Sequence, residues 1–199
     1  MVNIIQAMCD LEIGFGRWFG GDSWANWRVI LKGAFALPMT REELVAFREL
    51  AGGRDPPLKR VRELFVVGGR RGGKDSIASL LAVFAAAIEE GHVGKLRPGE
   101  QAIVQCLACD RDQSKIVLGD IRSFFEAIPE LAGMVTSVTR LGLELESGVN
   151  ITVATNSYRQ VRGRSILLAI FDEVAFWRSE DTVKPDYETY RAVLPSLAT

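Results

Sequence analysis

Short apolar runs alternate with amphipathic stretches along most of the chain, a pattern typical of strands that alternate with helices. The apolar runs lie at residues 64–68, 102–108 and 166–171, and helical periodicity covers residues 76–90 and 112–127. Strands without polar interruptions are typical of a parallel sheet that is covered on both faces. We therefore expect an α/β domain with a mostly parallel sheet and flanking helices.

Two further patterns add a β-hairpin and a helical N-terminal segment. Residues 141–146 and 149–154 flank a Ser-Gly pair, which predicts a hairpin. Near the N-terminus, Trp24 and Trp27 open a short helix, and Thr40 with Glu43 forms a capping box for a second one. A Gly- and Pro-rich stretch follows, so we expect a helical, aromatic segment at residues 1–57 and a core at residues 58–199.

The aromatic side chains of the N-terminal segment have two interpretations. They could stack on an adenine ring, or they could form a small apolar cluster that packs this segment on the core, and we favour the cluster. The residues concerned are Trp18, Phe19, Trp24 and Trp27.

Composition narrows the class of protein. The chain has 199 residues, of which 48% are hydrophobic, and its 24 Lys and Arg residues nearly balance its 25 Asp and Glu residues. The charge balance therefore gives no global basic field for nucleic acid. No apolar run approaches the roughly 20 residues that span a bilayer, and residues 1–10 lack the basic start of a signal peptide. We expect a cytoplasmic protein without a membrane segment.

The cysteines do not predict a metal or disulfide framework. Cys106 and Cys109 form a lone C-x-x-C, Cys9 is distant, and the single histidine is His92. A structural zinc site usually needs four ligands. We interpret the thiols as buried or half-buried groups near the end of a strand.

The strongest motif is a glycine-rich loop between a predicted strand and a predicted helix. Gly68, Gly73 and Lys74 match the G-x-x-x-x-G-K pattern of a phosphate-binding loop, with Gly69, Arg70, Arg71 and Gly72 between them. Glycines allow several main-chain N–H groups to face one anion, and the following helix contributes its positive end. Lys74 is expected to bind the β- and γ-phosphates of a nucleotide.

One position departs from this motif. Asp75 stands where a metal-binding Ser or Thr usually follows the lysine, and Ser76 comes one place later. Two like charges 4 Å apart cost about 4 kcal/mol at an effective dielectric near 20, so a carboxylate beside a phosphate is unfavourable without a cation. Either Asp75 and Ser76 help to bind Mg²⁺, or Asp75 is only an acid in the first helical turn and the site is weakened. The sequence leaves both hypotheses open.

A second motif lies at the end of the apolar run at residues 166–171. Asp172 and Glu173 follow it directly, and successive side chains of an extended chain point to opposite sides. The two acids can therefore have different tasks. Asp172 is expected to hold Mg²⁺, and Glu173 to orient and deprotonate an attacking water molecule.

With these motifs in place, the chain resembles the N-terminal ATPase region of the large terminase subunits of tailed phages, which package DNA. The resemblance covers most of residues 64–199. Besides the loop and the acid pair, it rests on Arg70, on the run at residues 108–113, on Arg162 with Gly163, and on residues 194–199. Residues 39–57 resemble the leader on the adenine side.

This resemblance implies a three-layer P-loop NTPase fold of the ASCE type, with ATP and Mg²⁺ as cofactors. It implies that Arg70 senses the γ-phosphate as a catalytic residue beside Lys74 and Glu173. It also implies double-stranded DNA, a portal protein and a small terminase subunit as partners, and a homo-oligomeric ring in the full-length protein. Two basic clusters could contact DNA, at residues 59–62 and 159–164, although short clusters of this kind are more often solvated.

The resemblance further predicts a fragment. Terminases continue with a coupling motif on another strand and with a nuclease, and this chain ends at Thr199 before both. The sheet would then lack its middle strand, which predicts low stability and poor motor activity. The alternatives are another ASCE ATPase, such as a helicase-like translocase, and a catalytically silent nucleotide-binding module.

Overall fold

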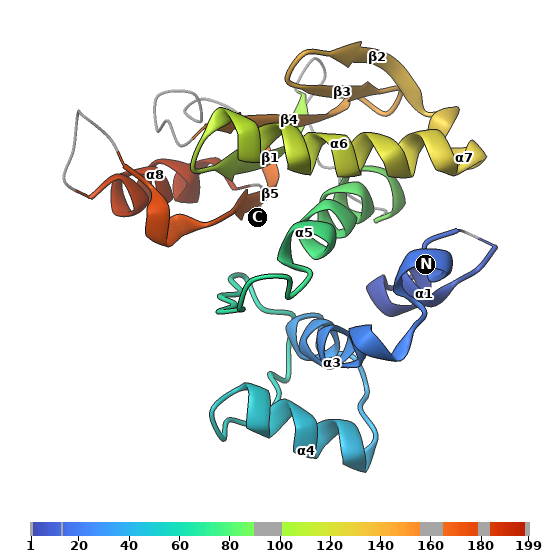
Figure 1. Ribbon diagram of the computed structural model, residues 1–199, viewed down its shortest axis with the longest axis vertical. Helices are drawn as coiled ribbons and strands as arrows, with labels where there is room; N and C mark the ends of the chain where they lie inside the picture. Colours follow the sequence, from blue (N-terminus) through green and yellow to red (C-terminus); the bar gives the residue numbers. More distant parts are fainter. Residues whose placement is uncertain (1, 13, 90–100, 156–164, 179–183, 198–199) are drawn as a thin grey trace. The chain divides into compact units, whose positions relative to one another are not determined.

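The computed structural model describes residues 2–12, 14–89, 101–155, 165–178 and 184–197. The chain forms two compact units, which we describe separately: an N-terminal unit, Val2–Gly72, and a sheet unit, Gly73–Thr199 (Figure 1). The predicted boundary was between residues 57 and 58, and the two units divide further along, at the end of the glycine-rich loop.

The N-terminal unit is helical, as the sequence predicted. Its helices are α1 (Ile4–Cys9), α2 (Gly16–Phe19), α3 (Ala25–Ala34) and α4 (Arg41–Leu50), with a 3₁₀ turn, η1 (Asp22–Trp24), before α3. The capping box that was predicted for α4 is present. The Thr40 hydroxyl accepts the Glu43 N–H at 3.3 Å, and the Glu43 carboxylate accepts the Thr40 N–H at 2.9 Å.

Aromatic side chains form the core of this unit. Phe15 and Phe19 are buried, and the Phe19 ring meets Trp24 edge-on with 4.8 Å between centroids. Gly33 lies against the ring of Phe47, where a Cβ atom would come within 2.1 Å of the ring. A glycine at this position therefore allows α3 and α4 to pack closely.

The sheet unit contains five described strands in the order β2-β3-β4-β1-β5. Their bounds are β1 (Ala102–Ala108), β2 (Val135–Thr139), β3 (Gly142–Leu145), β4 (Val149–Thr155) and β5 (Ser165–Phe171). Strand β1 pairs in parallel with both β4 and β5, whereas β2–β3 and β3–β4 are antiparallel. The predicted hairpin is confirmed as β3–β4. The sheet as a whole is mixed, so the prediction of a mostly parallel sheet was only partly correct.

Helices flank this sheet, as expected for an α/β unit (Figure 1). Helix α5 (Lys74–Val83) continues into a π-helical turn, η2 (Phe84–Ile88), and packs against α6 (Arg111–Ala127). The remaining helical elements are α7 (Pro129–Ala132), η5 (Val174–Phe176), α8 (Pro185–Val193) and η6 (Leu194–Ser196). The apolar face of α6 buries Val117, Ile121 and Phe125, in agreement with the predicted helical periodicity.

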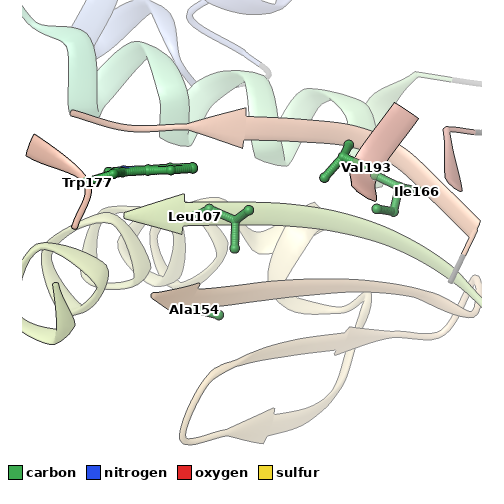
Figure 2. Packing of buried hydrophobic residues seen from close by; sticks show 5 residues of the cluster. All are labelled: Leu107, Ala154, Ile166, Trp177 and Val193. Atoms are coloured by element: carbon green, nitrogen blue, oxygen red, sulfur yellow. The ribbon is translucent and has the colours of Figure 1, made fainter. Parts of the chain in front are cut away.

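A buried cluster joins α8 to the parallel part of the sheet. Figure 2 shows Leu107 of β1, Ala154 of β4 and Ile166 of β5 beside Trp177 and Val193. Fully burying one large apolar side chain contributes about 1.5–3 kcal/mol relative to leaving it in water. Leu107 and Trp177 lie toward the carboxyl ends of the strands, where the acid pair follows β5, whereas Ile166 and Val193 pack at the amino end of β5.

The predicted strand at residues 64–68 is not formed. The main chain there pairs with no described strand, and Phe65 and Val67 are almost fully exposed. An apolar β-branched run forms a strand only where another strand supplies its main-chain hydrogen bonds. The apolar pattern alone could not show whether such a partner exists.

Strand β5 lies at one edge of the described sheet. On that side, Leu197 makes a single parallel bridge to Ile166. No described helix is both long enough and apolar enough to cross a membrane.

Candidate functional site

The acid pair lies at the carboxyl end of β5, held by the neighbouring strand. The Asp172 N–H donates to the Leu107 carbonyl of β1 at 2.8 Å, and the Asp172 carbonyl accepts the indole N–H of Trp177 at 2.8 Å. Both main-chain groups of Asp172 are thus fixed by hydrogen bonds. Its position is determined by the sheet and by the turn that follows it.

The Asp172 side chain is buried, with 8% of its surface exposed. Its Oδ2 atom accepts a hydrogen bond from Gln113 Nε2 at 3.0 Å. Burial raises the pKa of this carboxyl above its ordinary value, and the nearby charges of Asp75 and Glu173 raise it further. The Gln113 hydrogen bond and the Lys74 charge act in the opposite direction and lower the pKa.

Lys74 lies beside the acid pair. It is the first residue of α5, and its Nζ atom is 3.2 Å from Glu173 Oε1. The two side chains are 24% and 31% exposed. An ion pair that water still reaches contributes about 1 kcal/mol or less, so the ammonium can exchange partners with another anion.

Glu173 has an unusual main-chain conformation. Its φ is 51° and its ψ is 41°, in the left-handed region that non-glycine residues seldom occupy. Such a conformation costs of order 1–3 kcal/mol and persists where the surroundings impose it. Here it turns the chain sharply after β5 and places the Glu173 carboxylate against Lys74.

Further acids surround this pair. Asp75, in the first turn of α5, raises the pKa of Asp172 through its charge. Asp120 of α6 also has a raised pKa, mainly because of burial and secondly because of the charge of Asp75. Asp75 therefore lies close to both carboxyls. Ser76 follows it as a half-buried residue of the same helical turn.

The glycine-rich loop up to Gly72 belongs to the N-terminal unit. The Gly69 carbonyl accepts the Gly72 N–H at 3.2 Å, and Arg71 has a φ of 59°. The indole N–H of Trp27 donates to the Gly72 carbonyl at 2.7 Å. Trp27 thus makes a polar contact with the loop, which its assignment to an apolar cluster did not anticipate. Gly68 and Arg70 are exposed.

The predicted loop residues that belong to the sheet unit begin with Gly73. It adopts a φ of 74°, the left-handed conformation that suits a glycine, and stands as the N-cap of α5. Lys74, Asp75 and Ser76 form the first turn of that helix. The positive N-terminal end of α5 and the Lys74 ammonium group therefore belong to the same helical turn.

The predicted Mg²⁺ ligands at this site are the buried carboxylate of Asp172 and, in the first turn of α5, Asp75 and Ser76. Among the described residues, no group of three or more His, Cys, Asp or Glu side chains is arranged to hold a metal ion. Mg²⁺ does not need such a group, because it typically takes one or two carboxylates and completes its shell with water and substrate phosphates. A set of so few protein donors is compatible with that mode of binding, and Asp75 lies close enough to Asp172 to raise the pKa of its carboxyl.

The remaining predicted residues divide into three groups. Cys106 is buried and Cys109 is half-buried at the end of β1, as interpreted from the sequence. Arg60 lies over the Phe35 ring at 4.4 Å, and Lys59 and Arg62 are exposed in the same segment. The other basic cluster, with Arg159, Arg162 and Arg164, lies outside the described residues, as do Gly163 and His92.

Sequence reasoning missed three contributors to the site. Gln113 appeared only within a run that resembles a terminase segment, although its position three residues after the helix cap Asp110 placed it at a helix start. Trp177 and Asp120 carried no signal at all. Their roles depend on how α6 and the turn after β5 pack against the strand ends.

The fold and the site together define a mixed α/β protein with a lysine and a carboxylate pair at the end of a parallel strand. No protein-family model matches the chain, and no curated protein sequence matches it.

Proposed function

We propose that this chain is the ATP-binding and ATP-hydrolysing motor region of a DNA-packaging terminase large subunit, with the fold of an ASCE P-loop ATPase. The observation that carries the proposal is the 3.2 Å ion pair between Lys74 and Glu173 beside the buried Asp172. The sequence motif at residues 68–74 supplies the second support, because its glycines and lysine are the residue types that bind phosphates.

In this proposal the residues divide the work of hydrolysis. Gly68 to Lys74, with the two arginines between the glycines, hold the phosphates of ATP, and Arg70 responds to the γ-phosphate. Asp172, Asp75 and Ser76 would hold Mg²⁺, which would supply positive charge beside the phosphate oxygens. Glu173 accepts a proton from water as the water oxygen attacks the γ-phosphorus and the bond to ADP breaks.

The ion pair suggests how binding and catalysis are linked. A phosphate group that reaches Lys74 competes with Glu173 for the ammonium group. Because the ion pair is weak, the exchange costs little. It releases the Glu173 carboxylate, which can then act as a base toward water.

The experiment is to measure ATP turnover and ATP binding in the Glu173→Gln variant and in the unmodified chain. We expect turnover to fall by at least about 100-fold, the lower end of general-base contributions, while ATP binding is retained. Glu130→Gln, an exposed acid in the first turn of α7, is the matched control and should leave turnover unchanged.

Two outcomes would contradict the proposal. If the unmodified chain binds ATP but has no turnover to lose, the silent nucleotide-binding module is the better description. If it does not bind ATP at all, the phosphate-loop interpretation is wrong. Double-stranded DNA, a portal protein and a small terminase subunit remain proposed partners, and DNA-stimulated turnover would support the first of them.

A further inference from the structure

One hydrogen bond connects α6 to the acid pair and is not explained by the roles assigned so far. Gln113 Nε2 donates to Asp172 Oδ2 at 3.0 Å, although the two residues lie far apart in the sequence. The Asp172 carboxylate accepts no other hydrogen bond from the residues that the structure describes. Gln113 therefore determines how this carboxylate is turned.

The main chain of Gln113 is itself fixed at the start of α6. The Asp110 carboxylate caps the helix and accepts the N–H groups of Asp112 and Gln113 at 2.8 and 2.9 Å. Asp110 follows the end of β1 almost directly, and β1 also holds the main chain of Asp172 through Leu107. The end of β1 thus positions both the donor and the acceptor, and this fixes the two residues relative to one another.

The chemistry of an amide suits a carboxylate that must bind a cation. The amide NH₂ group donates one hydrogen bond but adds no positive charge. A lysine in its place would also orient the carboxylate, but it would neutralise the charge that attracts the cation. By holding Oδ2, Gln113 leaves Oδ1, which accepts no hydrogen bond from a described residue, as the oxygen for the metal.

We propose that Gln113 is a positioning residue that orients the Asp172 carboxylate for a divalent cation. The inference rests on the proposed function in one respect, since it takes Asp172 as the metal-binding group. It predicts a role for the residue in metal binding that a merely structural contact would not have. Outer hydrogen-bond partners of metal ligands typically account for about 10- to 100-fold in metal affinity or activity.

The test uses three variants of the full chain. Gln113→Ala removes the donor, and Gln113→Lys keeps a donor but adds a positive charge. Gln101→Ala, an exposed glutamine just before β1, is the matched control. Two quantities are measured: the affinity for Mn²⁺ alone, by electron paramagnetic resonance, and the Mg²⁺ concentration that gives half-maximal ATP turnover, with the KM for ATP beside it.

We expect Gln113→Ala and Gln113→Lys each to weaken Mn²⁺ binding and to raise the half-maximal Mg²⁺ concentration by about 10-fold or more. The KM for ATP at saturating Mg²⁺ should change little, and Gln101→Ala should match the parent chain. If Gln113→Lys binds Mn²⁺ as well as the parent does, the neutral amide has no special role and the proposal is wrong.

The remaining outcomes separate this inference from the proposed function. If Gln113→Ala lowers the melting temperature but leaves both metal measurements unchanged, the contact is only structural and the inference is overturned. If the parent chain shows no ATP turnover but binds Mn²⁺ in a Gln113-dependent way, the inference stands and the proposed function fails. If turnover is normal and independent of Gln113 at every Mg²⁺ concentration, the function stands and the inference fails.

Discussion

The indole N–H of Trp177 donates to the main-chain carbonyl of Asp172 across 2.8 Å. Trp177 is buried, its ring lies 5.2 Å from that of Phe171, and it belongs to the apolar cluster of Figure 2. One side chain thus joins the apolar core to the turn that carries the acid pair. The same turn contains Glu173 in its left-handed conformation.

Trp177→Phe should keep much of the ring packing but leave a buried carbonyl without its donor. An unsatisfied buried acceptor costs about 1–3 kcal/mol, and we expect the free energy of unfolding to fall by that amount. Urea unfolding of the full chain, followed by circular dichroism, measures the change. Trp18→Phe, at a tryptophan that is 37% exposed, should have a smaller effect. Equal losses in the two variants would show that ring size, and not the hydrogen bond, sets the cost.

Asp75→Ser tests the departure from the phosphate-loop motif. Asp75 lies close enough to Asp172 to raise the pKa of its carboxyl, so we expect it to help attract the cation. The substitution should therefore raise the Mg²⁺ concentration needed for half-maximal turnover, by about 10-fold if the aspartate contributes as a partner of the metal site. Asp186→Ser, an exposed acid in the first turn of α8, is the control. A large gain in turnover would show instead that Asp75 is a defect.

Asp120→Asn should stabilise the protein at neutral pH. Burial and the charge of Asp75 raise the pKa of this carboxyl, which means that folding penalises its ionised form. The penalty grows as the pH rises through the ordinary carboxyl range and is complete where both the folded and the unfolded chain are ionised. We expect a gain of under about 1 kcal/mol at pH 7, because solvent screens part of the penalty.

The pH dependence of the stability difference between Asp120→Asn and the parent chain tests the sign of this effect independently. As the pH falls below the ordinary range of an aspartate, both states become protonated and the advantage of Asp120→Asn should disappear. Thermal unfolding at pH 7 and at about pH 2.5 measures this. Asp112→Asn, at an 88% exposed side chain on the same helix, is the control variant.

Thiol labelling tests the burial of the strand end. Burial raises the pKa of Cys106 to about 12, with a smaller contribution from the charge of Asp172. Very little of the thiolate, which is the reactive form, is then present at pH 8. We expect no labelling of Cys106 by iodoacetamide in the folded chain and rapid labelling in urea, read by mass spectrometry of its peptide. Fast labelling without denaturant would mean that the end of β1 opens readily.

Much of the local structure could be predicted because it depends on neighbouring residues. The capping box at Thr40, the helix over residues 112–127 and the hairpin around Gly148 follow from spacing and turn chemistry within a few positions. The pattern likewise predicted Lys74 at the start of a helix and Asp172 at the end of a strand. A chemical role could be proposed for each of them, because a lysine that follows a glycine-rich loop and a pair of acids at a strand end each occur in few kinds of site.

The pairing of strands was less predictable. One predicted strand did not form, the strand β2 was not predicted, and both differences have the same cause. The run at residues 64–68 has the composition of a strand but no described partner, and β2 has a partner but a composition that is largely polar. Strand formation depends on hydrogen bonds to a segment elsewhere in the chain. A single-sequence pattern contains no information on whether that segment is present.

By itself the sequence determined which residues could do chemistry: the glycine-rich loop, Lys74, Asp172 and Glu173. Only the tertiary structure decided that Lys74 and Glu173 lie within 3.2 Å of one another and that Gln113 holds Asp172. The reason is physical. Residue type and short spacing fix local conformation and intrinsic reactivity, whereas contacts between distant residues depend on strand order, register and helix packing, which many weak interactions decide together.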